Sequence, residues 1–221
     1  MELDLHIHSK HSFDSRMEPA RIVEIARKRG LDGIAVTDHN SIKGSLEAMQ
    51  FAGKDLLIIP GAEIASTAGD ILAYFIHDQP PETKDPFEIV QWIKEHNGMV
   101  VMAHPFAYRL SIDAKLVKLL DGIEGFNSRH TAISIMDTSY NMNTGGDYEI
   151  AGFAIANNLA MTGGSDAHTY GEIGNGRTIV PGKTLEDVRI AIQNKDTTVA
   201  GRKTSFLSKI KSMITSIIKP K

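Results

Sequence analysis

Short apolar segments alternate with amphipathic segments along the whole chain. The apolar segments with strand length cover residues 3–8, 33–37, 56–64, 71–76, 99–104, 122–126 and 159–162. Strands that alternate with helical segments are typical of repeated βα units and a largely parallel sheet. Because about seven strands exceed what a small open sheet needs, we expect the sheet to close into a barrel.

The first amphipathic segment carries start and stop signals of a helix. Pro19 suits the first helical turn, the residues at 22, 23, 25 and 26 form an apolar face, and Gly30 suits a left-handed C-terminal position. Further helices are predicted over 86–97, 114–120, 148–157 and 185–194. The polar, Gly-rich stretch 138–147 predicts a surface loop.

The last residues differ in character from the rest. Over 205–219, apolar residues recur at helical spacing and lysines occupy other positions around the helix. We therefore divide the chain into one domain over 1–204 and a C-terminal amphipathic helix or tail over 205–221. This helix would pack against the body of the protein or a second subunit; an interfacial membrane helix is the alternative, and three lysines support it weakly.

Composition restricts the chemistry more than it restricts the fold. The 221 residues include 24 Lys and Arg against 27 Asp and Glu, so no overall positive charge attracts nucleic acid or membranes. The absence of cysteine excludes disulfides and thiolate nucleophiles, and leaves His and carboxylates as the strong side-chain metal ligands. With no signal peptide and no apolar stretch near the ~20 residues of a membrane span, we expect a cytoplasmic protein.

Metal-ligand side chains recur where the predicted strands end. In the segment LDLHIHS, strand alternation places Asp4, His6 and His8 on one face, and Asp14 follows in a loop. Polar side chains at the ends of barrel strands converge on one face, and imidazoles mixed with carboxylates suit two or three divalent cations. The sequence therefore predicts a hydrolytic metal centre. Its other ligand candidates are His39, Glu63, His104, Asp166 and His168.

The order of these motifs resembles the PHP (polymerase and histidinol phosphatase) superfamily from His6 to about His168. The matching motifs are HIHS with Asp14, TDHN at His39, PGAEI at Glu63, AHPF at His104, IEGFNSR at Asn127, and GGSDAH. The resemblance implies a distorted (β/α)7 TIM-like barrel with two or three divalent metal ions, manganese, iron or zinc. It also implies hydrolysis of phosphate esters through a metal-activated water.

The resemblance also assigns the ligands to ions. It implies that His6, His8, Glu63 and Asp166 hold one ion and that Asp14, His39 and His168 hold another. Glu63 would bridge to an intervening ion that His104 also binds. The further ligand of this ion is either Asp70 or His77, one on each side of the segment ILAYFI; Asp70 is slightly favoured because GDILAYF resembles a family pattern GHILGYF.

The catalytic and substrate-binding candidates lie among the same motifs. His39, Glu63 and His168 are the catalytic candidates, as ligands around the reacting water or, for the two histidines, as proton donors to the leaving alkoxide. Arg129 is the first candidate for the substrate phosphate because its planar fork matches two phosphate oxygens, and a solvated loop arginine is the alternative. The weaker candidates are Asn127, His130 and Arg109.

A chain of this length leaves little room for a large accessory domain. We therefore predict a phosphatase or phosphodiesterase that acts on a small phosphorylated metabolite or nucleotide. A nuclease acting on DNA or RNA ends is the alternative enzyme; it would need a basic groove, which the net charge of −3 neither shows nor excludes. The non-enzymatic alternative is a metal-stabilised binding module whose C-terminal helix mediates self-association or partner contact.

Overall fold

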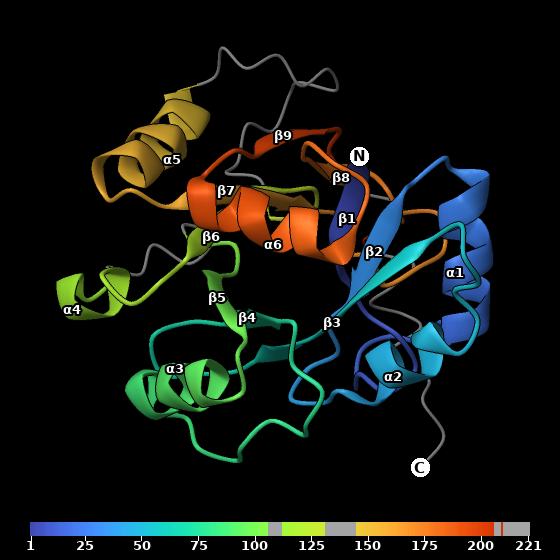
Figure 1. Cartoon of the computed structure of the whole chain (residues 1–221), viewed down its shortest axis with the longest axis horizontal. Helices are drawn as coiled ribbons and strands as arrows, with labels where there is room; N and C mark the ends of the chain where they lie inside the picture. The colour runs from blue at the N-terminus through green and yellow to red at the C-terminus, as the bar shows by residue number, and fades with distance from the viewer. Residues whose placement is uncertain (106–111, 131–144, 206–208, 210–221) are drawn as a thin grey trace.

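Strands and helices alternate along most of the chain, as Figure 1 shows. The computed structural model describes residues 1–105, 112–130, 145–205 and 209. Its strands are β1 (Glu2–Ile7), β2 (Gly33–Val36), β3 (Leu57–Ile64), β4 (Ile71–Tyr74), β5 (Met99–Met102), β6 (Gly122–Asn127), β7 (Ala160–Gly164), β8 (Gly176–Ile179) and β9 (Thr198–Gly201). Its helices are α1 (Pro19–Lys28), α2 (Lys43–Met49), α3 (Pro86–Glu95), α4 (Ala114–Val117), α5 (Gly145–Ala156) and α6 (Leu185–Asn194).

The strands form one sheet that curves into a nearly closed barrel. Their order is β7-β6-β5-β4-β3-β2-β1-β8-β9. The segment after β7 returns to β1, where the Asp166 N–H donates to the His6 carbonyl (2.8 Å) and the His8 N–H donates to the Ala167 carbonyl (2.9 Å). The predicted barrel is confirmed.

Strand direction differs from a simple series of βα units. The β1–β2–β3 and β5–β6–β7 groups are parallel, but β4 is antiparallel to both β3 and β5. The strands β8 and β9, which the sequence did not predict, form an antiparallel extension beside β1. Ile71 at the start of β4 pairs with Ile64 at the end of β3 and with Met102 at the end of β5, so β4 begins at the barrel end where these two neighbours finish.

Apolar side chains fill the barrel and the space beneath the helices. Leu3, Leu5 and Tyr74 belong to an interior cluster, which also includes Val188 and Ile192 of α6. Two other clusters lie beneath α1 and α2 and beneath α3 to α5. Burial of so much apolar surface is the main stabilising contribution to such a fold.

The helices follow the sequence signals where an apolar face exists. Helix α1 begins at Pro19 and buries Ile22, Val23 and Ala26, and Gly30 beyond its end has φ +68°, as predicted. Helix α2 was not predicted because its buried residues include Gly44 and Ser45, which give no apolar periodicity.

Two predictions fall near the edges of the described regions. Helix α5 begins at Gly145, so the last residues of the predicted loop 138–147 are helical, and residues 138–144 lie outside the described residues. The predicted C-terminal helix also lies outside them, except for Ser205 and Lys209. Within the described residues, no helix has the length and apolar character needed to cross a membrane.

Candidate metal centre

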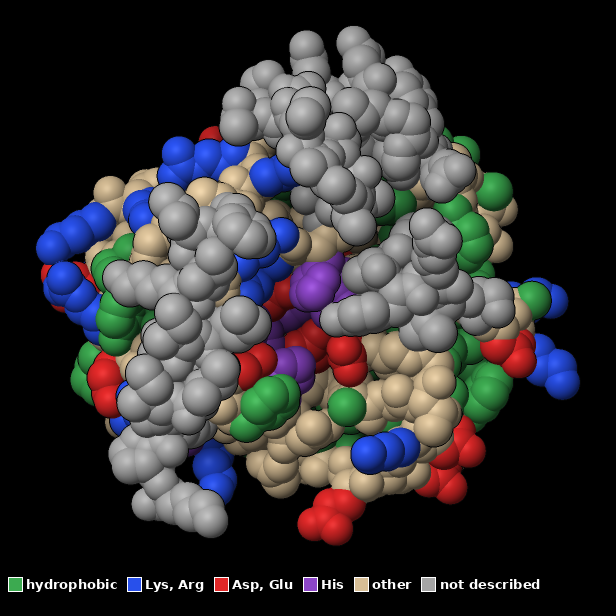
Figure 2. Space-filling view, turned by 180° about the vertical axis from the view of Figure 1, so that it is seen from behind, with side chains coloured by type: hydrophobic (Ala, Val, Ile, Leu, Met, Phe, Trp, Pro, Cys, Tyr) green, Lys and Arg blue, Asp and Glu red, His purple; other side chains and the backbone are tan. Residues whose placement is uncertain are grey.

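Histidine and acidic side chains gather at one end of the barrel. They line a cavity of about 410 Å³. Figure 2 shows purple histidines and red carboxylates together in a hollow on this face. The predicted ligands reach it from the ends of β1, β2, β3, β5 and β7, as the convergence argument requires.

Four side chains form a buried group at this end of the barrel, and two of them, Glu63 and Asp166, line the cavity. The Nε2 atoms of His6 and His8 are 3.1 Å apart. Glu63 Oε2 lies 3.4 Å from the first and 3.3 Å from the second, and Asp166 Oδ1 is 3.2 Å from His8 Nε2. All four side chains are at most 4% exposed. We call His6, His8, Glu63 and Asp166 the floor.

A second group is more accessible to solvent. Asp14 Oδ2 lies 2.7 Å from His168 Nε2 and 3.2 Å from His39 Nε2. His39 Nδ1 in turn lies 3.1 Å from Glu63 Oε2, so this group is joined to the floor. The three side chains are 10–20% exposed.

The intervening position brings Glu63, His104 and Asp70 together. His104 Nε2 is 3.1 Å from Glu63 Oε1 and 3.9 Å from Asp70 Oδ2. Asp70, 28% exposed, comes immediately before β4, which places it at this end of the barrel. His77 comes after the other end of β4. Its side chain is exposed and belongs to none of the groups of possible metal ligands. We call Asp14, His39, His168 and Asp70 the rim.

The floor and rim contain polar atoms that protein contacts leave unsatisfied. Among the described residues, Glu63 Oε2 and Asp14 Oδ1 are buried and have no hydrogen-bond partner. Three imidazole nitrogens lie 3.1 to 3.4 Å from Glu63 Oε2 without forming a hydrogen bond to it. Buried polar atoms are costly to leave unpaired, and lone pairs that converge in this way fit cations. The donor set therefore fits a cluster of divalent metal ions.

The protonation of the histidines reflects their neighbours. Burial lowers the pKa of His8 to about 4, so its imidazole is neutral and has a lone pair for a metal. Burial also lowers the pKa of His39 and His104, but hydrogen bonds to Asp14 and Glu63, respectively, outweigh it and raise both pKa values to about 9. Metal ions that bind these two residues would displace their protons.

Two residues of the site have unusual backbone conformations. His104 has φ 26° and Asp166 has φ 52°, in a region that residues other than glycine rarely adopt. The His104 N–H donates to Glu124 Oε2 (2.9 Å), and the Asp166 N–H donates to the His6 carbonyl (2.8 Å). These bonds hold conformations that cost about 1–3 kcal/mol each, a feature common at functional sites.

One expectation about β1 is wrong. The pairing of β1 with β2 is irregular between Asp4 and Ile7, so simple alternation breaks there. Ile7 packs beneath α1 instead of joining Leu3 and Leu5 inside the barrel. The Asp4 carboxylate accepts from the backbone N–H groups of Ser165 and Gly174, and it does not join His6 and His8.

Glu124 and Glu172 are buried carboxylates that the sequence analysis missed. Glu124 accepts from the Asn127 amide (2.9 Å) and lies 3.0 Å from His6 Nδ1, so it orients a floor ligand. Glu172 accepts from the His168 N–H (2.9 Å) and pairs with Arg129 (2.7 Å). Glu124 lies within the IEGFN motif, a usable signal, whereas nothing in the sequence marks Glu172.

The substrate-binding candidates occupy different positions. Arg129 and His130 line the cavity, and His130 Nε2 lies 3.4 Å from Asp166 Oδ2. Asn127 Oδ1 accepts from the backbone N–H groups of both residues (2.9 Å each), so it shapes the loop that carries them. Arg109 lies outside the described residues.

The comparisons with known proteins agree with this architecture. The PHP domain profile matches residues 4–104, and a PHP-associated profile matches residues 149–197. An uncharacterized protein of Methanocaldococcus jannaschii is 34% identical across 59% of this chain and 84% of its own length. A second uncharacterized protein of that organism is 27% identical across 79% of this chain and 68% of its own length.

Solved structures share the fold at lower identity. A two-domain Bacteroides vulgatus protein containing a predicted PHP-like metal-dependent phosphoesterase is 22% identical, with a TM-score of 0.75 over 99% of this chain and 70% of that chain. PsfC of Pseudomonas syringae is 20% identical, with a TM-score of 0.67 over 98% of this chain and 97% of that chain.

Proposed function

The chain belongs to the PHP family of metal-dependent phosphoesterases, and from that premise we propose that it hydrolyses a small phosphate ester. One observation carries the proposal: overlapping groups of histidines and carboxylates line the same cavity as Arg129. Such a cavity places cation ligands beside a group suited to phosphate oxygens.

The groups of side chains support an assignment of ligands to ions, which is part of the proposal. His6, His8, Glu63 and Asp166 would bind one ion, and Asp14, His39 and His168 another. Asp70, together with Glu63 and His104, would bind an intervening ion, for which manganese, iron and zinc are all chemically suitable. When bound, these ions would act as Lewis acids and lower the pKa of a water molecule.

The protein's own residues would orient the substrate. Arg129 Nη1 is held by the fully buried Glu172 at 2.7 Å, which fixes one edge of the guanidinium while the side chain lines the cavity. A guanidinium fixed in this way would bind phosphate oxygens with little loss of side-chain entropy. We propose metal binding as the role of His39 and His168; either one, if it did not bind an ion, would be the candidate to donate a proton to the leaving oxygen.

The size and position of the cavity favour a small substrate. Its volume of about 410 Å³ lies within the range typical of small-molecule sites, roughly 300–1,000 Å³. Phe13, 69% exposed, lies at its edge with its ring 4.9 Å from that of His39. We therefore favour a phosphorylated metabolite or a nucleotide over a polymer.

The test is a turnover assay with defined metals. Purified protein would be loaded separately with manganese, iron or zinc and given small phosphomonoesters, phosphodiesters, nucleotides and short oligonucleotides. We expect release of phosphate or of an alcohol from at least one small ester. Faster cleavage of oligonucleotide ends than of every small ester would instead support the nuclease alternative.

Two histidine variants make the assay specific. His8→Ala removes a floor ligand and should abolish turnover while circular dichroism shows a folded protein. His96→Ala changes a partly buried histidine at the end of α3, outside the metal centre, and should retain turnover. If His8→Ala were as active as the unaltered protein, the proposed use of this centre would be wrong.

A further inference from the structure

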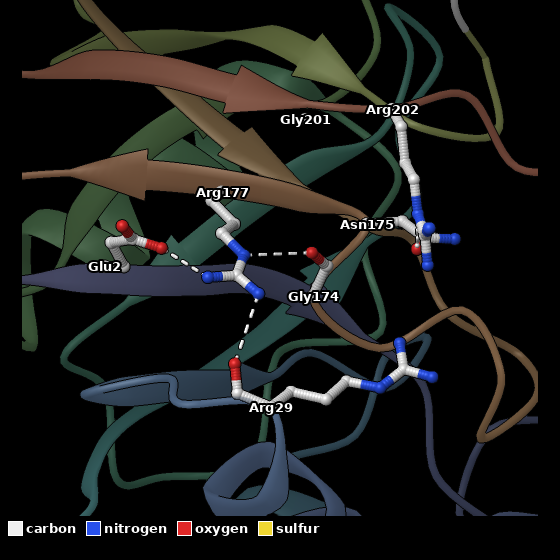
Figure 3. Close-up of a pocket in the computed structure, with 7 residues that line it drawn as sticks. All are labelled: Glu2, Arg29, Gly174, Asn175, Arg177, Gly201 and Arg202. Atoms are coloured by element: carbon white, nitrogen blue, oxygen red, sulfur yellow. Dashed lines mark hydrogen bonds and ion pairs between the residues drawn. The ribbon is translucent and has the colours of Figure 1, made fainter. Parts of the chain in front are cut away.

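A second cavity, outside the metal centre, is lined by three arginines. Its volume is about 620 Å³, and none of its lining residues lines the metal-centre cavity. Arg29 comes from the end of α1, Arg177 from β8, and Arg202 from the segment after β9 (Figure 3). We call this cavity the arginine pocket; its other lining residues are Glu2, Gly174, Asn175 and Gly201.

The charge of the arginine pocket is not balanced by its own residues. Three arginines face a single carboxylate, that of Glu2, which pairs with Arg177 and leaves a net lining charge of +2. Neither Arg29 nor Arg202 forms an ion pair within the part of the chain that the structure describes. The pKa of Arg29 is lowered by burial and then by the charge of Arg202, so the two cations act on one another.

Neutral groups of the protein hold the arginines in place. Arg177 Nε donates to the Gly174 carbonyl (3.0 Å) and its Nη2 donates to the Arg29 carbonyl (3.2 Å). Arg29 Nη2 donates to the Gly171 carbonyl (3.0 Å), and Arg202 Nε donates to Asn175 Oδ1 (2.9 Å). Figure 3 shows these side chains around Gly174 and Asn175. Carbonyl and amide oxygens orient a guanidinium without cancelling its charge. Besides Glu2, the buried Asp4 supplies an opposing charge, since it accepts from the Gly174 N–H and raises the pKa of Arg29 against the larger effect of burial.

The chemistry of the lining restricts the ligand. Guanidinium groups match the paired oxygens of phosphates, and several together favour an anion with two or more charges. None of the described lining residues is aromatic or aliphatic, so this lining suits a compact anion better than a ligand with an acyl chain. We propose that the arginine pocket binds a compact phosphate anion, inorganic pyrophosphate or phosphate being its simplest form, at a site separate from the metal centre.

Calorimetric titration of pyrophosphate, and separately of phosphate, tests the proposal. The full chain would first be freed of metal with a chelator that is then dialysed away, so that neither metal ions nor the chelator competes. We expect saturable binding of at least one of the two anions. Arg202→Gln should weaken it by about tenfold or more, because a charge-assisted contact to phosphate is lost. Among the described residues, the Arg202 guanidinium forms one hydrogen bond, to Asn175 Oδ1, so we expect the Arg202→Gln variant to fold.

Three variants separate this site from general attraction. Arg202→Lys keeps the charge but loses the fork and should bind less tightly than the unaltered protein. Arg21→Gln, which removes an exposed arginine paired with Glu24 on α1, should bind normally. Arg129→Gln removes the phosphate-binding candidate of the metal-centre cavity, and the binding that Arg202→Gln weakens should persist in it. The proposal would be overturned by absence of saturable binding, by equal loss in Arg21→Gln and Arg202→Gln, or by loss in Arg129→Gln alone.

A substitute variant and a second measurement test the proposal if Arg202→Gln does not fold. If Arg202→Gln does not match the unaltered protein by circular dichroism, Arg29→Lys would replace it in the titration. A crystal soaked in tungstate should show anomalous density between Arg29 and Arg202. Density confined to the metal centre would contradict the proposed pocket.

Discussion

The floor and the rim of the metal centre use the same residue types in different surroundings. Floor side chains are at most 4% exposed, whereas rim side chains are 10–28% exposed. Charges inside a protein are costly unless they are paired or bind metal, so the floor needs its cations more than the rim does. We therefore expect the floor to depend most on bound metal, whereas the rim, which also carries ligands, is the part of the centre that a substrate meets first.

Glu63→Gln should have the largest effect because this side chain serves both regions. Its carboxylate lies within 3.4 Å of His6, His8, His39 and His104. Losing several kcal/mol of charge stabilisation corresponds to a fall in kcat/KM of roughly a thousandfold. Metal content measured by mass spectrometry should fall with activity. The exposed Glu186→Gln on α6 is the matched control and should change neither.

Glu124→Gln tests whether the floor depends on residues that do not bind metal. Glu124 lies 3.0 Å from His6 Nδ1 and accepts from the His104 N–H, so it orients two ligands. Loss of such an orienting partner typically lowers metal affinity by about 10- to 100-fold. Chelator competition measures the change. Unchanged affinity in a folded Glu124→Gln protein would show that packing alone orients the floor.

The pH dependence of metal binding tests whether ligands that are protonated in metal-free protein bind the metal. His39 and His104 have pKa values of about 9, above the ordinary value of 6.5, so both are protonated at pH 7 in metal-free protein. Their contribution to the stability of metal-free protein is complete below pH 6.5 and is lost as pH rises through about 9.

Metal must displace these protons, so its apparent affinity should increase with pH up to about 9. The increase should be about tenfold per pH unit for each proton released. Chelator competition at pH 7 and 8 measures it, and calorimetry in buffers of different ionisation enthalpy counts the protons. Equal affinity at both pH values would mean that these histidines do not bind the metal.

Variants of Asp70 and His77 test which of the two residues binds the intervening ion. Asp70→Ala should lower the affinity for the intervening ion by about tenfold, on the scale of one charged contact. Asp70 Oδ2 lies 3.9 Å from His104 Nε2, whereas His77 is exposed beyond the end of β4. His77→Ala should therefore bind all ions normally. The opposite result would place the further ligand at His77.

The Asp70 ambiguity shows why some of the site could not be predicted from the sequence. Apolar segments gave all seven predicted strands, and polar residues at their ends identified the cavity-lining ligands. The direction of each strand could not be predicted, because an apolar strand has the same sequence pattern in either orientation. With β4 assumed parallel, the residue after it would reach the site; because β4 is antiparallel, the residue before it does. Glu172 was missed for a related reason, since its role depends on contact with Arg129 across 43 positions.

Phe13→Ala should have the smallest effect and tests whether the rim contacts substrate. Phe13 is 69% exposed and stacks beside His39, so its removal should cost the floor nothing. If the substrate packs against this ring, KM should rise about two- to tenfold, the scale of one aromatic contact, while kcat and metal content stay constant. The exposed Phe51→Ala, beyond α2, controls for loss of apolar surface. A fall in metal content with Phe13→Ala would instead mean that floor and rim are coupled, and the division of roles between them would fail.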